Sequence, residues 1–198
     1  MDQEFWDRLY NESERRWSGR PNGALRVEVE DMTPGKALDL GCGEGGDAIW
    51  LASKGWKVTA VDISPVALAR AAEAAGPDSG IDWQQADPRV SPPPSRSFDL
   101  VSAQYFPVLH EEDHATIRGL LDAVAPGGTL LVVSHLIEGT PPEGWSGPDP
   151  REFYQPPEIA ELLGDDWVIE SHGNRARVDT PHDNPHHADI VLRARRVR

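Results

Sequence analysis

The sequence is poor in cysteine and in positive charge. Cys42 is its single cysteine, so a disulfide within the chain is impossible. Lysine and arginine together number 19, against 33 aspartates and glutamates, which gives a formal net charge of −14. Nucleic-acid backbones and anionic membrane surfaces bind through clustered lysine and arginine. We therefore expect neither of them as a partner.

Long hydrophobic runs are missing as well. No apolar stretch approaches the roughly 18 residues that a membrane-spanning helix needs. The chain starts Met1-Asp2-Gln3-Glu4, which is acidic where a signal peptide is basic. These features predict a cytoplasmic protein. The 198 residues fit one domain, in which we expect a helical cap over residues 1–32 and a core over residues 36–198.

A glycine-rich stretch near residue 40 organises the chain. The apolar run at residues 36–40 predicts a short buried strand, and residues 47–54 predict a helix. Between them stands Gly41-Cys42-Gly43-Glu44-Gly45-Gly46, in which glycine lets the backbone lie against a ligand. The helix N-terminus offers free N–H groups to the same ligand. Strand, glycine turn and helix together indicate a βαβ nucleotide-binding unit.

The glycine spacing alone leaves the nucleotide open. Gly41, Gly43 and Gly46 fit the G-x-G-x-x-G pattern of dinucleotide sites. Gly41, Gly43 and Gly45 also form a tighter G-x-G-x-G pattern, which Asp39 precedes.

A second acidic residue follows the next expected strand, over residues 56–61. Asp62 lies 21 positions after Gly41, close to the offset of about 20 expected for a carboxylate that binds ribose. Ser64 and Pro65 supply an N-cap and a first-turn proline for a helix over residues 66–75. Asp62 is therefore free for a ligand, although a ribose-binding acid does not distinguish one adenosine cofactor from another.

The remaining elements alternate between strands and helices, which is typical of an α/β protein. Residues 2–22 include an amphipathic helix, and residues 24–32 form a second helix. The later strands are expected over residues 81–86, 97–103, 129–134, 167–171 and 187–194, and the later helices over residues 111–125 and 156–163. Long loops are expected over residues 90–95, 135–155 and 173–185.

Several of these stretches together resemble the class I S-adenosylmethionine (SAM) methyltransferases. The likeness rests on the acid-preceded glycine loop, on Phe98-Asp99-Leu100-Val101, and on Leu121 followed by Ala125-Pro126-Gly127-Gly128-Thr129-Leu130. Trp6, Tyr10 and Trp17, followed by Pro21-Asn22, resemble the N-terminal cap of the thiopurine and tellurite-resistance group. The resemblance implies a Rossmann-like three-layer α/β/α sandwich with a seven-stranded, mostly parallel sheet, an antiparallel last strand and an N-terminal helical cap.

The same resemblance implies the positions of two sites. Asp62 would bind the ribose, Asp87 would accept from the adenine amino group, and cap aromatics would face the cationic sulfonium. The full set of expected cofactor contacts is Trp17, Asp39, Gly41, Cys42, Gly43, Gly45, Asp62, Ile63, Ala86, Asp87 and Gln104. The expected acceptor pocket contains Trp6, Tyr10, Tyr105, Phe106, His135 and Trp145.

Histidines are the candidate proton acceptors, because imidazole titrates near neutral pH. His110, His135 and His172 each follow or end an expected strand, and we favour His110 as the catalytic residue. His182, His186, His187 and Asp189 could suggest a metal site. His186 and His187 are adjacent, however, so on a strand they point to opposite faces. We predict no metal site.

The predicted function is transfer of a methyl group from SAM to a small-molecule nucleophile (an S, O, N or metalloid centre) by in-line displacement, by a monomer or homodimer. Two alternatives remain open on the sequence. One is an NAD-dependent oxidoreductase, which the G-x-G-x-x-G pattern and Asp62 allow. The other is a SAM-binding module that has lost catalysis.

Overall fold

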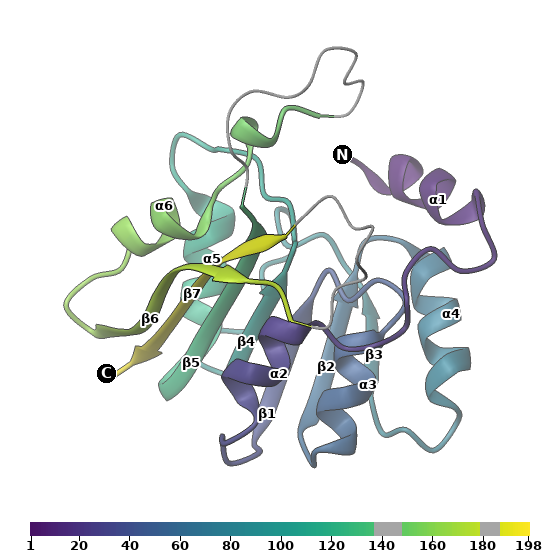
Figure 1. Cartoon of the computed structure of the whole chain (residues 1–198), viewed down its shortest axis with the longest axis horizontal. Helices are drawn as coiled ribbons and strands as arrows, with labels where there is room; N and C mark the ends of the chain where they lie inside the picture. Colours follow the sequence, from purple (N-terminus) through teal and green to yellow (C-terminus); the bar gives the residue numbers. More distant parts are fainter. Residues whose placement is uncertain (137–147, 179–186) are drawn as a thin grey trace.

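A computed structural model describes residues 1–136, 148–178 and 187–198 of the chain. Its centre is a seven-stranded sheet in the order β3-β2-β1-β4-β5-β7-β6 (Figure 1). Neighbouring strands pair in parallel from β3 to β5, whereas β7 is antiparallel to both of its neighbours. The strands are β1 (Lys36–Leu40), β2 (Lys57–Asp62), β3 (Asp82–Gln85), β4 (Phe98–Gln104), β5 (Val124–His135), β6 (Trp167–Ala176) and β7 (Ala188–Arg196). The expected mostly parallel sheet with an antiparallel last strand is confirmed.

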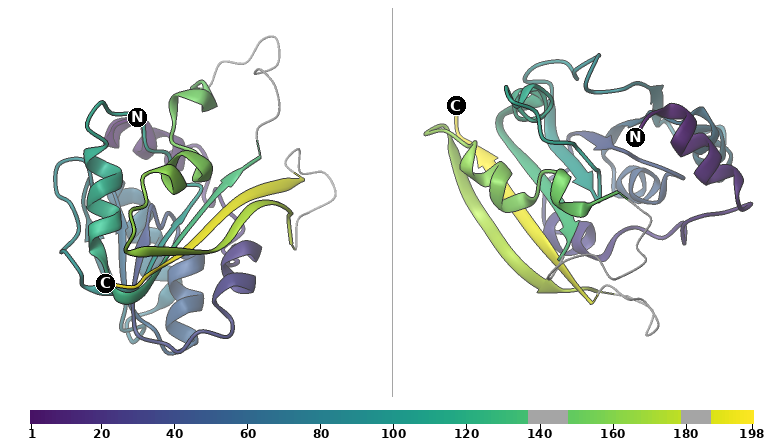
Figure 2. Two further views of the ribbon diagram at one scale, coloured as in Figure 1. Left: turned by 90° about the vertical axis from the view of Figure 1, so that its left-hand side faces the viewer. Right: turned by 90° about the horizontal axis from the view of Figure 1, so that it is seen from above.

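Helices cover both faces of the sheet, which gives the three expected layers. Figure 2 shows α5 (Ala115–Ala123) and α6 (Pro156–Glu161) on the face opposite α2 (Gly23–Val29) and α3 (Gly46–Ser53). The helix α4 (Pro65–Ala75) contributes Leu68 to the same hydrophobic cluster as α2 and α3. None of the helices in the described part of the chain has the length and hydrophobicity that crossing a bilayer requires.

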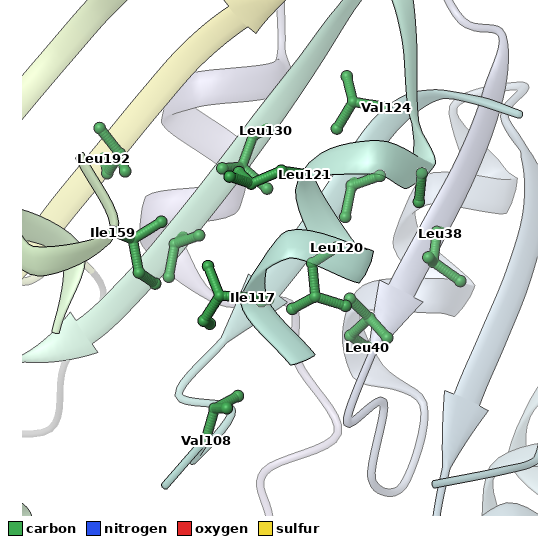
Figure 3. Close-up of a cluster of buried hydrophobic side chains, with 14 of the residues drawn as sticks. Leu38, Leu40, Val108, Ile117, Leu120, Leu121, Val124, Leu130, Ile159 and Leu192 are labelled. Atoms are coloured by element: carbon green, nitrogen blue, oxygen red, sulfur yellow. The ribbon is translucent and has the colours of Figure 1, made fainter. Parts of the chain in front are cut away.

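The core consists of two hydrophobic clusters, one on each face. Leu38 and Leu40 of β1 pack against Ile117 and Leu120 of α5 on one face (Figure 3). On the other face, Ala37 of β1 belongs to the cluster that α2, α3 and α4 cover. Residues 37–40 are buried because a central parallel strand is covered on both sides, which explains why all of them except Asp39 are apolar.

The N-terminal helix α1 (Gln3–Asn11) lies beside the upper end of α4 in Figure 1. Asp2 caps it by accepting from the N–H of Phe5 at 2.9 Å. The hydroxyl of Ser64, at the start of α4, donates to the Asp7 carboxylate at 2.5 Å. As expected, Ser64 also caps α4 by accepting from the N–H of Ala67.

Several expected boundaries are wrong, and the largest differences are in α5, β5 and β6. The helix expected from residue 111 begins at Ala115, because the Glu111 carboxylate instead accepts from the N–H and hydroxyl of Thr116. That helix ends at Ala123, so β5 starts at Val124, before the glycines. The strand β6 runs to Ala176, so the loop expected from residue 173 is strand as far as residue 176.

Candidate functional site

The glycine loop lies at the carboxyl end of β1 with its backbone in the left-handed region. Gly43 and Gly45 have φ angles of +53° and +83°, which side chains disfavour. A Cβ on Gly45 would lie 2.9 Å from Ala71 of α4 and 2.9 Å from the Trp83 ring. Tight packing and backbone conformation both require glycine at this position.

Asp62, at the end of β2, fixes the shape of this loop. One oxygen of its carboxylate accepts from the N–H of Gly43 at 2.8 Å, and the other accepts from the N–H of Ser64 at 2.9 Å. The side chain is 7% exposed. Burial raises the pKa of Asp62, although the N–H groups of Ser64 and Gly43 oppose the shift. Each oxygen keeps a second lone pair that can accept from a ribose hydroxyl.

Four buried carboxylates surround the loop: those of Asp39, Glu44, Asp47 and Asp62. Burial raises the pKa of Asp39, and the nearby charges of Asp47 and Asp62 raise it further. Burial also raises the pKa of Asp47 to about 6, even though Asn22 donates two hydrogen bonds of 2.7 Å to this carboxylate. Ionisation of these carboxylates is therefore unfavourable in the protein alone, and a bound cation would favour their charged forms.

Glu44 and the cap segment are joined directly. The Glu44 carboxylate accepts from the N–H of Arg16 at 3.0 Å and from the N–H of Trp17 at 2.8 Å, and it pairs with Arg70 at 3.0 Å. Burial opposes ionisation, but the N–H groups of Trp17 and Arg16 and the Arg70 guanidinium together lower the pKa of Glu44. This role of Glu44 could not be predicted from the sequence, because the donors are backbone groups 27 and 28 residues away.

The aromatic residues of the cap reach the loop to different extents. Tyr10 is buried, and a Cβ on Gly43 would lie 2.9 Å from its hydroxyl. Burial raises the pKa of Tyr10, and the charge of Asp62 adds to the shift. Trp17 is 52% exposed and points Nε1 at the Tyr10 hydroxyl, 3.4 Å away. Trp6 is half-buried, with its ring 6.4 Å from that of Tyr10.

On the far side of β2 lie the residues expected to contact adenine. The N–H of Ala86 donates to the Asp62 carbonyl at 3.1 Å, which holds this segment beside the ribose acid. Ile63 is half-buried there. Asp87 forms a two-pronged pair with Arg89, with bonds of 2.9 and 2.7 Å, and the Arg89 guanidinium lowers its pKa. To accept from an adenine amino group, Asp87 would have to share its oxygens with Arg89.

Two buried oxygens near the loop accept no hydrogen bond within the described residues: Asp39 Oδ2 and Gln104 Oε1. Gln104 ends β4, beside β1, and its amide donates to Ser102 at 3.1 Å. Phe106 follows, and a Cβ on Gly41 would lie 2.5 Å from its ring. Acceptor oxygens without a donor, beside a loop shaped by glycine, fit a ligand that carries an ammonium group.

A polar cluster lies beyond Gln104. Tyr105, at the end of β4, has a φ of +54°, a conformation that costs a bulky residue on the order of 1–3 kcal/mol. Its ring stacks on that of His135 at 4.2 Å, and its hydroxyl donates to Asp189 at 2.9 Å. Arg177 Nε lies 3.3 Å from the Asp189 carboxylate. Burial raises the pKa of Tyr105, and the charge of Asp189 adds to the shift.

Of the other expected site residues, His110 and His172 are exposed, whereas Cys42 is buried. His110 is 41% exposed and pairs with Glu158 of α6 at 3.0 Å. We expect His172 to follow the end of a strand, but it is instead an exposed residue inside β6. Trp145, His182 and His186 lie outside the described residues. Within the described ranges no group of three or more metal-ligating side chains is found. Cys42 is buried in the loop, where burial and the charge of Asp39 raise its pKa.

This strand order, with a glycine loop after β1 and an acid after β2, defines a Rossmann-like fold of the methyltransferase type. Residues 37–128 match the family model described as a methyltransferase domain. The 2-methyl-6-phytyl-1,4-hydroquinone methyltransferase of Synechocystis sp. is 34% identical over 147 residues, which cover 70% of this chain and 42% of that protein. The trans-aconitate 2-methyltransferase of Streptomyces coelicolor is 37% identical over 125 residues, which cover 57% of this chain and 39% of that protein.

A solved structure shares the fold over nearly the whole chain. It is described as "Conversion of a Disulfide Bond into a Thioacetal Group during Echinomycin Biosynthesis", with a TM-score of 0.73, 24% identity, and coverage of 98% of this chain and 91% of that one. The chain spans less than half the length of the two curated relatives described above. Residues 37–128 therefore match a methyltransferase domain, and the chain is similar in sequence to SAM-dependent methyltransferases of class I.

Proposed function

We propose that the protein binds SAM at the glycine loop and transfers its methyl group to a small-molecule nucleophile. The acidic character of the chain, with its net charge of −14, supports a small acceptor over a nucleic acid. It also suits a protein of the cytoplasm. The names of the two relatives suggest hydroquinones and carboxylic acids as acceptor classes to test first.

The buried negative charge around the loop is the observation that carries this proposal. A dinucleotide would bring a pyrophosphate, with two negative charges, against Asp39, Asp47 and Asp62, whereas Glu44 is already paired with Arg70. At about 8 Å and an effective dielectric constant near 20, each pair of like charges costs about 2 kcal/mol. The ammonium and sulfonium groups of SAM would be attracted by the same carboxylates. This charge balance favours SAM over NAD, even though the glycine spacing permits either.

The residues present fit the parts of SAM. Asp62 would accept from the ribose hydroxyls, with Ile63 and Asp87 on the adenine side. Asp39 and Gln104 would offer their unpartnered oxygens to the ammonium group. When bound, SAM supplies a methyl group that is already activated on a cationic sulfur. The work left to the chain is to bind both partners, orient them and exclude water.

The cap would close the site from above. Glu44 belongs to the glycine loop and accepts from the N–H groups of Arg16 and Trp17. The cap would therefore close and the loop become ordered together. Tyr10 would then shield the methionine side of the ligand from water. Such closure orders a segment that contributes little to the core.

Thermal unfolding with separate ligands tests the proposal. A ligand at 100 times its dissociation constant stabilises a protein by about 2.7 kcal/mol. We expect SAM and S-adenosylhomocysteine to raise the melting temperature, and NAD and NADP to leave it unchanged. Stabilisation by NAD alone would refute the proposal. Transfer of labelled methyl from SAM to a panel of phenols, carboxylic acids, amines and thiols would then separate an enzyme from an inactive SAM-binding module.

A further inference from the structure

Gly46, the fourth glycine of the loop, is the one whose purpose the glycine spacing leaves open. It is the first residue of α3, and it completes the G-x-G-x-x-G pattern of dinucleotide sites. We propose that Gly46 is a positioning residue for cofactor binding. It provides the space in which residues 16–22, which we call the cap link, lie across the start of α3. The inference rests on the proposed binding of SAM and adds how the chain holds its cap over that ligand.

Gly46 is in close contact with the main chain of the cap link. A Cβ on Gly46 would lie 2.8 Å from the carbonyl oxygen of Arg20 and 3.3 Å from the carbonyl carbon of Gly19. Both neighbours are backbone atoms, so no side-chain rotation could make room for a larger residue. The φ of Gly46 is outside the left-handed region, unlike those of the other three glycines of the loop. Glycine is therefore required at this position for the space and not for the backbone angle.

Hydrogen bonds hold the cap link on either side of this close contact. At its start, the N–H groups of Arg16 and Trp17 donate to the Glu44 carboxylate at 3.0 and 2.8 Å. At its end, Asn22 donates to the Asp47 carboxylate twice, from its backbone N–H and from its side-chain amide, each at 2.7 Å. The cap link therefore follows the loop from one carboxylate to the other and is fixed at both ends.

The course of the cap link decides what lies over Gly43, at the centre of the glycine loop. A Cβ on Gly43 would lie 3.6 Å from Trp17 Cδ1 and 2.9 Å from the Tyr10 hydroxyl. Trp17 Nε1 donates to the same hydroxyl at 3.4 Å. Trp17 belongs to the cap link, and Tyr10 is joined to it through this bond. Displacement of the cap link would therefore move both aromatic side chains away from the loop and leave a bound cofactor less covered.

The same contacts divide the four buried carboxylates around the loop into two pairs. Glu44 and Asp47 hold the cap link. Asp39 Oδ2 accepts no hydrogen bond from a described residue, and Asp62 accepts from Gly43 and Ser64, which lie outside the cap link. The residues that position the cap and those that would bind the ligand are therefore different, so substitutions can separate the two roles.

Gly46→Ala tests the proposal in the full-length protein. Alanine favours a helix but would overlap the Arg20 carbonyl, so the cap link should shift while the core stays folded. We expect the dissociation constant of S-adenosylhomocysteine to rise about 10- to 100-fold. The KM for SAM should rise with it, while kcat at saturating SAM changes by less than about threefold. A glycine that only stabilised the fold would instead lower the urea midpoint and leave both binding values unchanged.

Gly119→Ala is the matched control. Gly119 is also a helical glycine, and its Cβ would lie 3.3 Å from Pro92, but it belongs to α5 on the opposite face of the sheet (Figure 2). This variant should bind S-adenosylhomocysteine as the wild type does. Equal affinity of Gly46→Ala and the wild type would overturn the proposal.

Asn22→Ala provides a second test that leaves α3 unchanged. It removes the side-chain bond to Asp47 and should weaken S-adenosylhomocysteine binding in the same direction. Combined with Gly46→Ala, its effect on the binding free energy should be smaller than alone, because both substitutions release the same segment. Fully additive effects, or wild-type affinity in Asn22→Ala, would overturn the proposal. Failure of the wild-type protein to bind S-adenosylhomocysteine would instead refute the proposed function.

Discussion

Replacement of Glu44 by glutamine should release the cap from the glycine loop. The Glu44 carboxylate accepts from two backbone N–H groups, those of Arg16 and Trp17, at 3.0 and 2.8 Å, and pairs with Arg70. Hydrogen bonds to a buried charge contribute about 1.5–3 kcal/mol each. Both N–H groups donate to the same oxygen, so glutamine can keep these two bonds only without the charge, and its NH2 group replaces the oxygen that accepts from Arg70. We estimate a loss of about 2–4 kcal/mol, after discounting the Arg70 pair because its guanidinium is partly exposed.

This loss corresponds to a roughly 30- to 1,000-fold shift of the cap toward its open form. Trypsin should therefore cut after Arg15 or Arg16 faster in Glu44→Gln than in the wild type, and S-adenosylhomocysteine should slow the cut less. Hydrogen exchange over residues 3–17 should accelerate to a similar degree, while the urea midpoint of the core stays nearly constant. Glu14→Gln, an exposed acid in the same segment, is the control. Equal cutting of wild type, Glu44→Gln and Glu14→Gln would refute the reasoning.

Three further outcomes follow from the same region. Asp62→Ala should weaken the binding of S-adenosylhomocysteine by on the order of 2–4 kcal/mol, because the substitution removes two charge-assisted hydrogen bonds to ribose. Calorimetry measures this affinity, and an unchanged value would show that Asp62 is purely structural. Burial raises the pKa of Asp47 to about 6, so the folded state holds this proton more tightly than the unfolded chain, whose value is near 3.8. The resulting stabilisation is complete below pH 4 and is lost as pH rises through 6. Urea unfolding should therefore show the free energy of unfolding increasing by on the order of 1–3 kcal/mol as pH falls from 7.5 to 4.5. Asp47→Asn should reduce this dependence on pH. An equal dependence in the variant would contradict the raised pKa of Asp47. Gly45→Ala should destabilise by about 2–4 kcal/mol through a positive φ and a steric clash, whereas Gly127→Ala, with a φ of +82° and open space around it, should show the cost of the positive φ alone.

Much of the fold could be predicted because local and long-range signals agree. The apolar run at Lys36–Leu40 and the Ser64-Pro65 cap specify β1 and the start of α4, and both are confirmed. The end of β6 could not be predicted, because Gly173–Ala176 is polar and becomes strand only through its pairing with β7. Strand propensity depends on the neighbouring strand more than on the residues themselves.

The candidate site likewise contains some residues that could be predicted from the sequence and others that could not. The glycines and Asp62 could be found by their spacing, since loop geometry sets that spacing. The contact of Glu44 with the cap could not be predicted. Its carboxylate accepts from backbone N–H groups, which almost every residue type has, so the sequence of the cap carries no pattern that reveals the contact. Asp189 had been considered only beside histidines, as a possible metal ligand. Its signal was an acid directly before the apolar residues 190–192 of β7, and that signal becomes meaningful only when Tyr105 and His135 are seen beside it.

The place of β7 has a consequence for biosynthesis. Although β7 follows every other strand in the sequence, it lies between β5 and β6 and pairs with both. Arg196, near its end, is buried and donates to the carbonyls of Leu121 and Val124, where α5 ends. Until the ribosome has synthesised β7, β5 and β6 each present an open edge, which is a template for aggregation. The nascent chain must therefore wait for these residues before the sheet can close, so premature termination before β7 should give aggregates rather than a shorter folded protein.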